Sequence, residues 1–230
     1  MAIYTDITVL LDRSGSMASI KEAMETAFNS FIKEHQAIPT TKISLIQFDD
    51  TDPQEIVYLG VPVKYVEPLK IKPRGGTPLL DALCTAIDNT GKRYSNMDES
   101  VRPDQVLFII ITDGEENASR SHKRSDVSSR VTNQREKFNW NFIYLGANQD
   151  AFSESLSLGI PYTNVLKYSP DPFHIDNAWK GLVGSTVSYA SNIGGMRGMS
   201  SSLAFDEQTR SRSATKTDLD VESTTTTGTA

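Results

Sequence analysis

Cysteine is almost absent from this chain, with Cys84 as its single instance in 230 residues. An intrachain disulfide is therefore excluded, and the fold must depend on a hydrophobic core. Cys84 lies in an apolar pattern of helical spacing, which favours a buried structural thiol over a reactive one. Scarce cysteine is also typical of a reducing compartment.

Long apolar runs and an excess of basic charge are absent as well. No apolar stretch approaches the ~18 residues of a membrane-spanning helix, and no basic segment with an apolar core precedes Asp12. We therefore predict a cytoplasmic protein with no membrane partner. The formal net charge is −6, whereas nucleic-acid binders usually carry a basic surface. We predict no nucleic-acid partner.

The apolar segments that are present alternate between two spacings. Runs of β-branched and apolar residues predict strands, whereas apolar residues three and four positions apart predict helices. Strands are predicted over 7–11, 42–48, 106–111, 140–145 and 162–166, and residues 54–66 form two short strands or one bent edge strand. Helices are predicted to begin near residues 16, 78, 125, 151 and 173. This alternation predicts an α/β layer fold with a mostly parallel sheet, in which ligands bind beyond the carboxyl ends of the strands.

The composition divides the chain into two parts. Residues 1–193 carry the alternating pattern and are predicted to form one domain. Residues 194–230 are rich in Gly, Ser and Thr, and are predicted to be a flexible tail with no core of its own.

Oxygen-bearing side chains follow three of the predicted elements. Asp12, Ser14 and Ser16 follow the first strand at alternate positions, Thr77 follows the Gly75-Gly76 turn, and Asp113 follows the strand 106–111. Because the carboxyl ends of parallel strands share one edge, we expect these five residues to converge. An all-oxygen set favours a hard divalent cation such as Mg²⁺, while Mn²⁺ or Ca²⁺ would also fit. Taken alone, Asp12, Ser14 and Ser16 could instead be a helix N-cap.

The three motifs together resemble those of von Willebrand factor A (vWA) domains. The set Asp12-x-Ser14-x-Ser16, Thr77 and Thr112-Asp113-Gly114 is similar to the metal-ion-dependent adhesion site of that family, and the resemblance extends from about residue 6 to 192. It is strongest to the stand-alone cytosolic vWA proteins of bacteria and their phages. Further supporting stretches are Gln47-Phe48-Asp49, Pro73-Arg74-Gly75 and Leu145-Gly146-Ala147-Asn148-Gln149-Asp150. The resemblance implies a Rossmann-like three-layer sandwich, with one antiparallel edge strand and helices on both faces.

The resemblance also implies a binding mechanism. Ser14, Ser16 and Thr77 would bind the cation through neutral hydroxyls, whereas Asp12 and Asp113 would act mainly through waters. The cation would then keep enough positive charge to accept an Asp or Glu carboxylate from a partner protein. Further candidates, for direct contacts with the partner, are the neighbouring residues Arg13, Arg74, Gly76, Glu115 and Glu116. Glutamates in such a loop are more often solvated charges than partner contacts.

Two other functions compete with this interpretation. A Mg²⁺-dependent phosphoryl hydrolase would need a general acid two residues after a nucleophilic Asp12, but Ser14 occupies that position. No Gly-x-Ser-x-Gly elbow is found, and His35, His122 and His174 lack metal-ligand spacing and are expected in solvated or cap positions. We therefore predict no enzymatic activity. Family resemblance also allows an assembly subunit or an adaptor of an AAA+ ATPase, with oligomers formed through the tail.

Overall fold

The computed structural model describes residues 3–147, 150–191 and 203–215. Within these residues six strands form one sheet in the order β3-β2-β1-β4-β5-β6. The strands are β1 (Thr5–Asp12), β2 (Thr41–Phe48), β3 (Glu55–Pro62), β4 (Gln105–Thr112), β5 (Asn141–Gly146) and β6 (Val165–Lys167). All neighbouring pairs are parallel except β2 and β3, which are antiparallel. The predicted fold class is confirmed.

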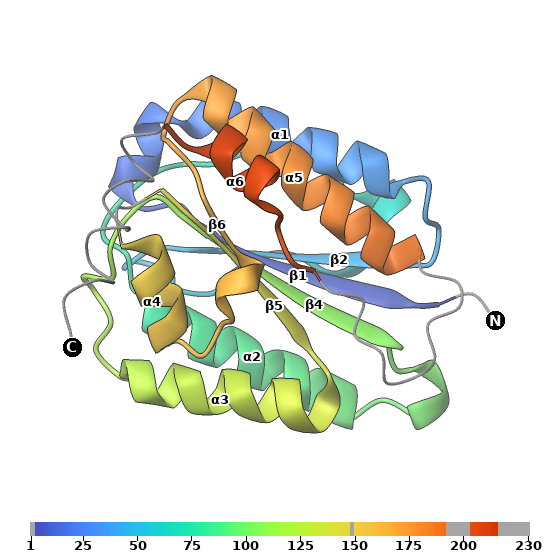
Figure 1. Ribbon diagram of the computed structural model, residues 1–230. Coiled ribbons are helices and arrows are strands. Elements are labelled where there is room, and N and C mark those ends of the chain that lie inside the picture. The colour runs from blue at the N-terminus through green and yellow to red at the C-terminus, as the bar shows by residue number, and fades with distance from the viewer. Residues whose placement is uncertain (1–2, 148–149, 192–202, 216–230) are drawn as a thin grey trace, which may run out of the picture.

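Helices cover both faces of this sheet (Figure 1). One face carries α1 (Lys21–His35), α5 (Pro172–Ser191) and α6 (Glu207–Ser213). The other carries α2 (Leu79–Ser95), α3 (Arg124–Phe138) and α4 (Ala151–Ser157). Short 3-10 helices occupy Gly15–Ser19, Val63–Tyr65, Glu99–Val101 and Tyr162–Asn164. The predicted strand near 162–166 is thus a 3-10 turn followed by the three-residue β6.

The central strands are apolar on both sides because each side packs under helices. In β1, Ile7, Val9 and Leu11 join the core beneath α1 and α5, while Leu10 joins the core above α2 and α3. A strand buried in this way needs a nearly continuous apolar run, which β1 and β4 both have. Cys84 is fully buried in the α2 core, as predicted, and burial raises the pKa of its thiol to about 11.

The edge strand β3 settles an alternative that the sequence left open. Residues 55–62 form one strand, and its pairing with β2 shifts register on either side of Leu45. Gly60 has φ +62°, a conformation that side chains with a Cβ rarely adopt, and its amide bonds the Ser44 hydroxyl at 2.9 Å. The segment is therefore one irregular edge strand, followed by a 3-10 turn.

Residues 203–215 are packed against the domain, which differs from the predicted tail without a core. Leu203 and Phe205 are 2% and 6% exposed, and the Phe205 amide donates to the Thr163 carbonyl at 2.9 Å. The Ser213 hydroxyl donates to the Lys167 carbonyl at 2.7 Å, so this segment covers the outer edge of β6. The composition of this segment did not predict the packing, because the segment is mostly polar and two large apolar residues anchor it. The rest of the predicted tail, 194–202 and 216–230, lies outside the described residues, as do Asn148 and Gln149.

Candidate functional site

The predicted oxygen cluster lies where the strand order reverses. β1 pairs with β2 on one side and with β4 on the other, with Leu11 opposite Ile111. The carboxyl ends of β1 and β4 are therefore neighbours, and the loops that leave them diverge to opposite faces. This is the topological switch point at which open α/β sheets bind ligands.

Asp12 is the last residue of β1 and is fully buried. One carboxylate oxygen accepts the Ser14 amide at 2.7 Å, and the other accepts the Thr112 hydroxyl at 2.7 Å. Burial raises the pKa of Asp12 to about 6, and the nearby charge of Asp113 adds to the rise, while the two hydrogen bonds oppose it. Asp12 is thus held rigidly, in a place where its negative charge is poorly solvated.

Ser14, Ser16 and Asp113 form a hydrogen-bonded chain beside Asp12. The two serine hydroxyls lie 3.0 Å apart, and the Ser16 hydroxyl donates to Asp113 Oδ1 at 2.7 Å. Ser14 is buried, Ser16 is exposed, and Asp113 is half-buried. Burial raises the pKa of Asp113, although the bond from Ser16 opposes this shift. The hydrogen bonds therefore link buried Ser14, through exposed Ser16, to half-buried Asp113.

Thr77 completes the cluster from the loop before α2. It is 1% exposed, and two hydrogen bonds to Asn117 fix its backbone. The Asn117 side-chain Oδ1 accepts the Thr77 backbone amide at 2.9 Å, and the Asn117 backbone amide donates to the Thr77 carbonyl at 3.1 Å. A Cβ built at Gly114 would lie 3.4 Å from both the Thr77 and the Ser16 hydroxyl. The absence of a side chain at Gly114 leaves the two hydroxyls facing the same small space.

The N-cap interpretation of the first motif is wrong in detail. Ser14 precedes a 3-10 turn over Gly15–Ser19, and its side chain caps no backbone amide. The helix predicted to begin near Ser16 begins at Lys21 instead. The hydroxyls of Ser14 and Ser16 are therefore directed to each other and to Asp113 rather than to a helix end.

The five residues weighed as partner contacts have different environments. Arg13 is 4% exposed and contacts Asp49 and Glu55, so its side chain does not line the surface. The Arg74 side chain is 48% exposed and bonds Asp49 at 2.9 Å. Gly76 is half-buried beside Asn117.

The two glutamates after Asp113 also differ from each other. Glu115 is exposed. Glu116 accepts the amides of Leu80, Ala118 and Ser119 at 3.0, 3.0 and 2.7 Å, so it caps α2 and shapes its own loop. The roles of Glu116, Asn117 and Thr112 depend on contacts between loops far apart in the chain, which spacing alone does not reveal.

The cluster has no cationic side chain of its own. Among the described residues, neither Asp12 nor Asp113 forms an ion pair with Lys, Arg or His. The part of the chain that the structure describes also contains no group of three or more His, Cys, Asp or Glu side chains that could hold a metal ion. Hydroxyl groups, which are not among these four residue types, supply three of the five oxygen donors here. The donor set suits a hard cation and lacks the nitrogen and sulfur ligands of a zinc site.

The histidines lie away from this cluster. His122 contacts Asp81 at 2.9 Å, and His174 contacts Asp171 at 2.5 Å. His35 is fully buried against Phe31, so its predicted solvated or cap position is wrong. Its pKa is lowered by burial, which leaves it neutral. None of the three is a base for the cluster.

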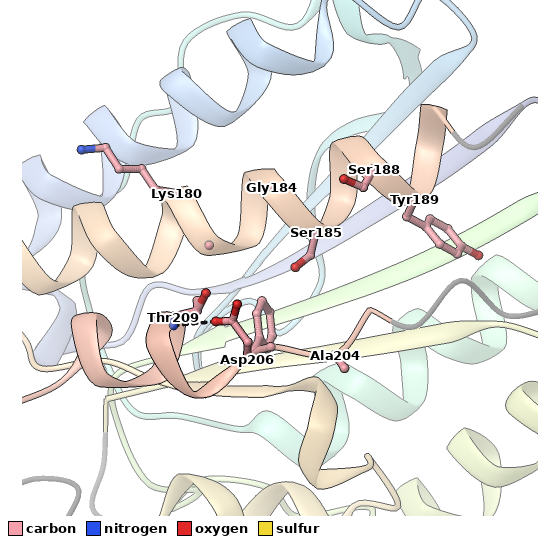
Figure 2. Close-up of a pocket in the computed structure, with 10 residues that line it drawn as sticks. Lys180, Gly184, Ser185, Ser188, Tyr189, Ala204, Asp206 and Thr209 are labelled. Carbon is pink, nitrogen blue, oxygen red and sulfur yellow. Dashed lines mark hydrogen bonds between the residues drawn. The ribbon is translucent and has the colours of Figure 1, made fainter.

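A pocket of about 460 Å³ lies elsewhere, between α5 and residues 204–209 (Figure 2). It is bordered by Lys180, Ser185, Ser188 and Asp206, and none of its lining residues belongs to the oxygen cluster. The Asp206 carboxylate accepts the Thr209 amide at 2.7 Å and caps α6. Asp206 lies in the predicted tail, and its carboxylate has a local structural role.

Comparison with known proteins identifies the family. Residues 6–159 match the von Willebrand factor type A domain. The chain therefore belongs to the vWA family, and the predicted family membership is confirmed. A search of the curated proteins found no match.

Solved structures share the fold at low sequence identity. Proximal thread matrix protein 1 from the mussel byssus has a TM-score of 0.57 at 13% identity, over 79% of this chain and 48% of that one. The vWF domain of the type V pili tip protein Mfa5 from Porphyromonas gingivalis has a TM-score of 0.58 at 8% identity, over 84% and 98%. Manganese-loaded TRAP protein from Plasmodium vivax has a TM-score of 0.50 at 15% identity, over 79% and 71%.

Several of these matches are to parts of larger proteins. The chain spans less than half of the mussel protein and 43% of a von Willebrand factor type A protein from Catenulispora acidiphila. At these identities the comparisons establish the fold. Within the described residues, none of the helices is both long and apolar enough to cross a membrane.

Proposed function

We propose that this chain is a metal-dependent protein-binding module. Its cation would be held by Asp12, Ser14, Ser16, Thr77 and Asp113, and would accept an acidic side chain of a partner protein. The observation that carries the proposal is the continuous oxygen cluster, in which burial raises the pKa of both carboxylates and no cationic side chain among the described residues balances them.

The residues present fit Mg²⁺, and Mn²⁺ or Ca²⁺ would also suit an all-oxygen set. Asp12 has both carboxylate oxygens engaged by protein donors, which favours an indirect role through waters. The three hydroxyls are neutral, so a cation held by them keeps most of its charge. When bound, that cation supplies positive charge for the two aspartates and a coordination position for a partner's carboxylate.

The fold relatives supply independent support for a cation and for a binding role. One of them is described as manganese-loaded, and another as a pilus adhesin, SpaC from Lactobacillus rhamnosus GG. We extend both properties to this chain as part of the proposal. The adhesion-site assignment, the cytoplasmic location and the bacterial or phage origin stay predictions.

A binding role fits this cluster better than catalysis does. Ser14 holds the position that a general acid would need, and its hydroxyl lies 3.0 Å from the Ser16 hydroxyl rather than beside a base. A phosphatase assay with Mg²⁺ tests the alternative. Activity that Asp12→Asn abolishes would establish a hydrolase instead.

The test is a calorimetric titration of Mg²⁺, and separately of Mn²⁺, into the full chain and into Thr77→Ala. We expect Thr77→Ala to weaken cation binding by about tenfold or more, since a hydroxyl donor is lost. Thr90→Ala is the matched control, because Thr90 is also a buried threonine but lies within α2, outside the cluster. Equal affinities for all three proteins would contradict the proposal.

Partner binding is tested by affinity purification in Mg²⁺, repeated in EDTA and with Asp12→Ala. Because linkage between cation and partner is reciprocal, both changes are expected to reduce recovery of the same protein. Recovery that neither change affects would show that binding does not use this site.

A further inference from the structure

Asp49, in the loop after β2, joins the two loops that carry the hydroxyl donors. It is fully buried, and its Oδ2 accepts the Nε–H groups of both Arg13 and Arg74. Its Oδ1 accepts the amides of Thr51 and Asp52 at 2.7 and 2.9 Å. One carboxylate oxygen therefore fixes its own turn, while the other is shared between two arginines.

The two arginines come from different parts of the cluster. Arg13 lies between Asp12 and Ser14, and Arg74 lies three residues before Thr77. Their loops also meet through the backbone, since the Arg74 amide donates to the Arg13 carbonyl at 2.9 Å and the Gly15 amide donates to the Gly75 carbonyl at 3.0 Å. Asp49 thus holds together two loops that two backbone hydrogen bonds align.

The conformation of Gly75 brings the second loop close to this turn. Gly75 has φ +65°, a conformation that residues with a Cβ rarely adopt, so a substitution at this position would strain the turn. Burial alone would raise the pKa of Asp49. Hydrogen bonds from Asp52 and Arg74, among others, outweigh this effect and hold the pKa below its usual value. Asp49 is therefore charged at neutral pH, and its bonds to the arginines are charge-assisted, which makes them stronger than neutral ones.

We propose that Asp49 is a positioning residue that holds the Ser14 loop against the Thr77 loop and thereby sets the cation affinity of the site. The affinity part of this proposal rests on the proposed function, whereas the loop-holding part does not. Arg13 and Arg74 then act mainly as the two arms of this contact rather than as partner contacts.

The experiment compares Asp49→Asn, Arg74→Gln and Asp6→Asn with the unchanged chain. Asp6→Asn is the matched control. Asp6 is also buried and bonded to an arginine, but it lies near the start of β1, at the end of the strand away from the site. Arg74→Gln removes one arm through a side chain that is 48% exposed, so it protects the test if Asp49→Asn fails to fold.

Two readouts are measured on each protein. Without any cation, amide hydrogen exchange is expected to speed up about tenfold at Gly15 and Arg74 in the first two variants, and to stay unchanged in the control. In Mg²⁺ titrations the same two variants are expected to bind about tenfold more weakly. The affinities are compared well below the unfolding temperature of every variant, so that a general loss of stability is not mistaken for an effect on the site.

The outcomes separate the two proposals. Unchanged exchange at Gly15 and Arg74 would overturn the role of Asp49, and so would affinity losses no larger than that of Asp6→Asn. If the unchanged chain binds neither Mg²⁺ nor Mn²⁺, the proposed function fails. The exchange measurement still decides whether Asp49 holds the two loops together.

Discussion

The two ends of strand β1 each carry a fully buried aspartate, Asp6 at the start and Asp12 at the finish. Burial raises the pKa of both. Asp6 accepts hydrogen bonds from Arg93 and from the Tyr4 hydroxyl, both at 3.2 Å. Among the described residues, Asp12 accepts hydrogen bonds from uncharged donors alone, the Ser14 amide and the Thr112 hydroxyl.

The difference is in which group supplies the positive charge. A buried carboxylate is destabilising unless it is paired, and at Asp6 helix α2 provides the partner through Arg93. At Asp12 no described Lys, Arg or His side chain does so, and a second carboxylate, Asp113, lies close enough to raise its pKa further. The charge of Asp6 is therefore balanced within the chain, whereas Asp12 lies at the site where we propose that a cation from solution binds.

Breaking the pair of Arg93 and Asp6 should have the largest effect. Arg93→Met leaves Asp6 buried and without its cation, and we expect a loss of about 3–5 kcal/mol in the free energy of unfolding, measured by urea denaturation. Arg102→Met is the surface control, and the double variant Arg93→Met with Asp6→Asn should recover part of the loss. An effect of Arg93→Met as small as that of Arg102→Met would show that the pair does not stabilise the fold.

Neutralising Asp12 should instead raise the free energy of unfolding when cations are absent. Burial raises the pKa of Asp12 to about 6, so at pH 7 its charged form is destabilising in the folded chain. Asp12→Asn removes this charge, and in EDTA at pH 7 we expect the variant to be more stable by about 1–3 kcal/mol. Saturating Mg²⁺ should stabilise the unchanged chain and not the variant, because only the former has the proposed site intact. Equal stabilisation of both proteins by Mg²⁺ would contradict the comparison, and Asp6→Asn should leave the response to Mg²⁺ intact.

The smallest expected effect is on the pH dependence of stability at Asp6. Because the pKa of Asp6 is raised on folding, the folded chain retains this proton where the unfolded chain has lost it. The contribution of Asp6 therefore becomes less favourable as the pH rises above its usual pKa towards the folded value. Urea unfolding of the unchanged chain and of Asp6→Asn in EDTA, from about pH 4 to about pH 7, should show the variant gaining relative stability with pH. If the variant instead loses stability relative to the unchanged chain as the pH rises, the raised pKa of Asp6 is contradicted.

Much of the fold could be predicted because the strands are buried on both faces. Apolar runs as short as residues 7–11 and 106–111, in a chain of alternating helices and strands, are typical of strands that lie between two layers of helices. The residues of the candidate site could also be named from the sequence, since Asp12 directly follows the first run and Asp113 follows the second after Thr112. The structure does bring Ser14, Ser16 and Asp113 into hydrogen-bond contact, with Thr77 beside them. Cation binding itself stays a prediction.

The sequence by itself determined the layer fold, the family and the oxygen-bearing residues at the strand ends, because all of these follow from local spacing. Only the tertiary structure decided which charges meet: Arg93 with Asp6, and Arg13 and Arg74 with Asp49. It also decided that residues 203–215 pack along β6. These contacts join segments between 25 and 87 positions apart. They depend on which loops and edges the folded sheet brings together, and no pattern within a single segment records that.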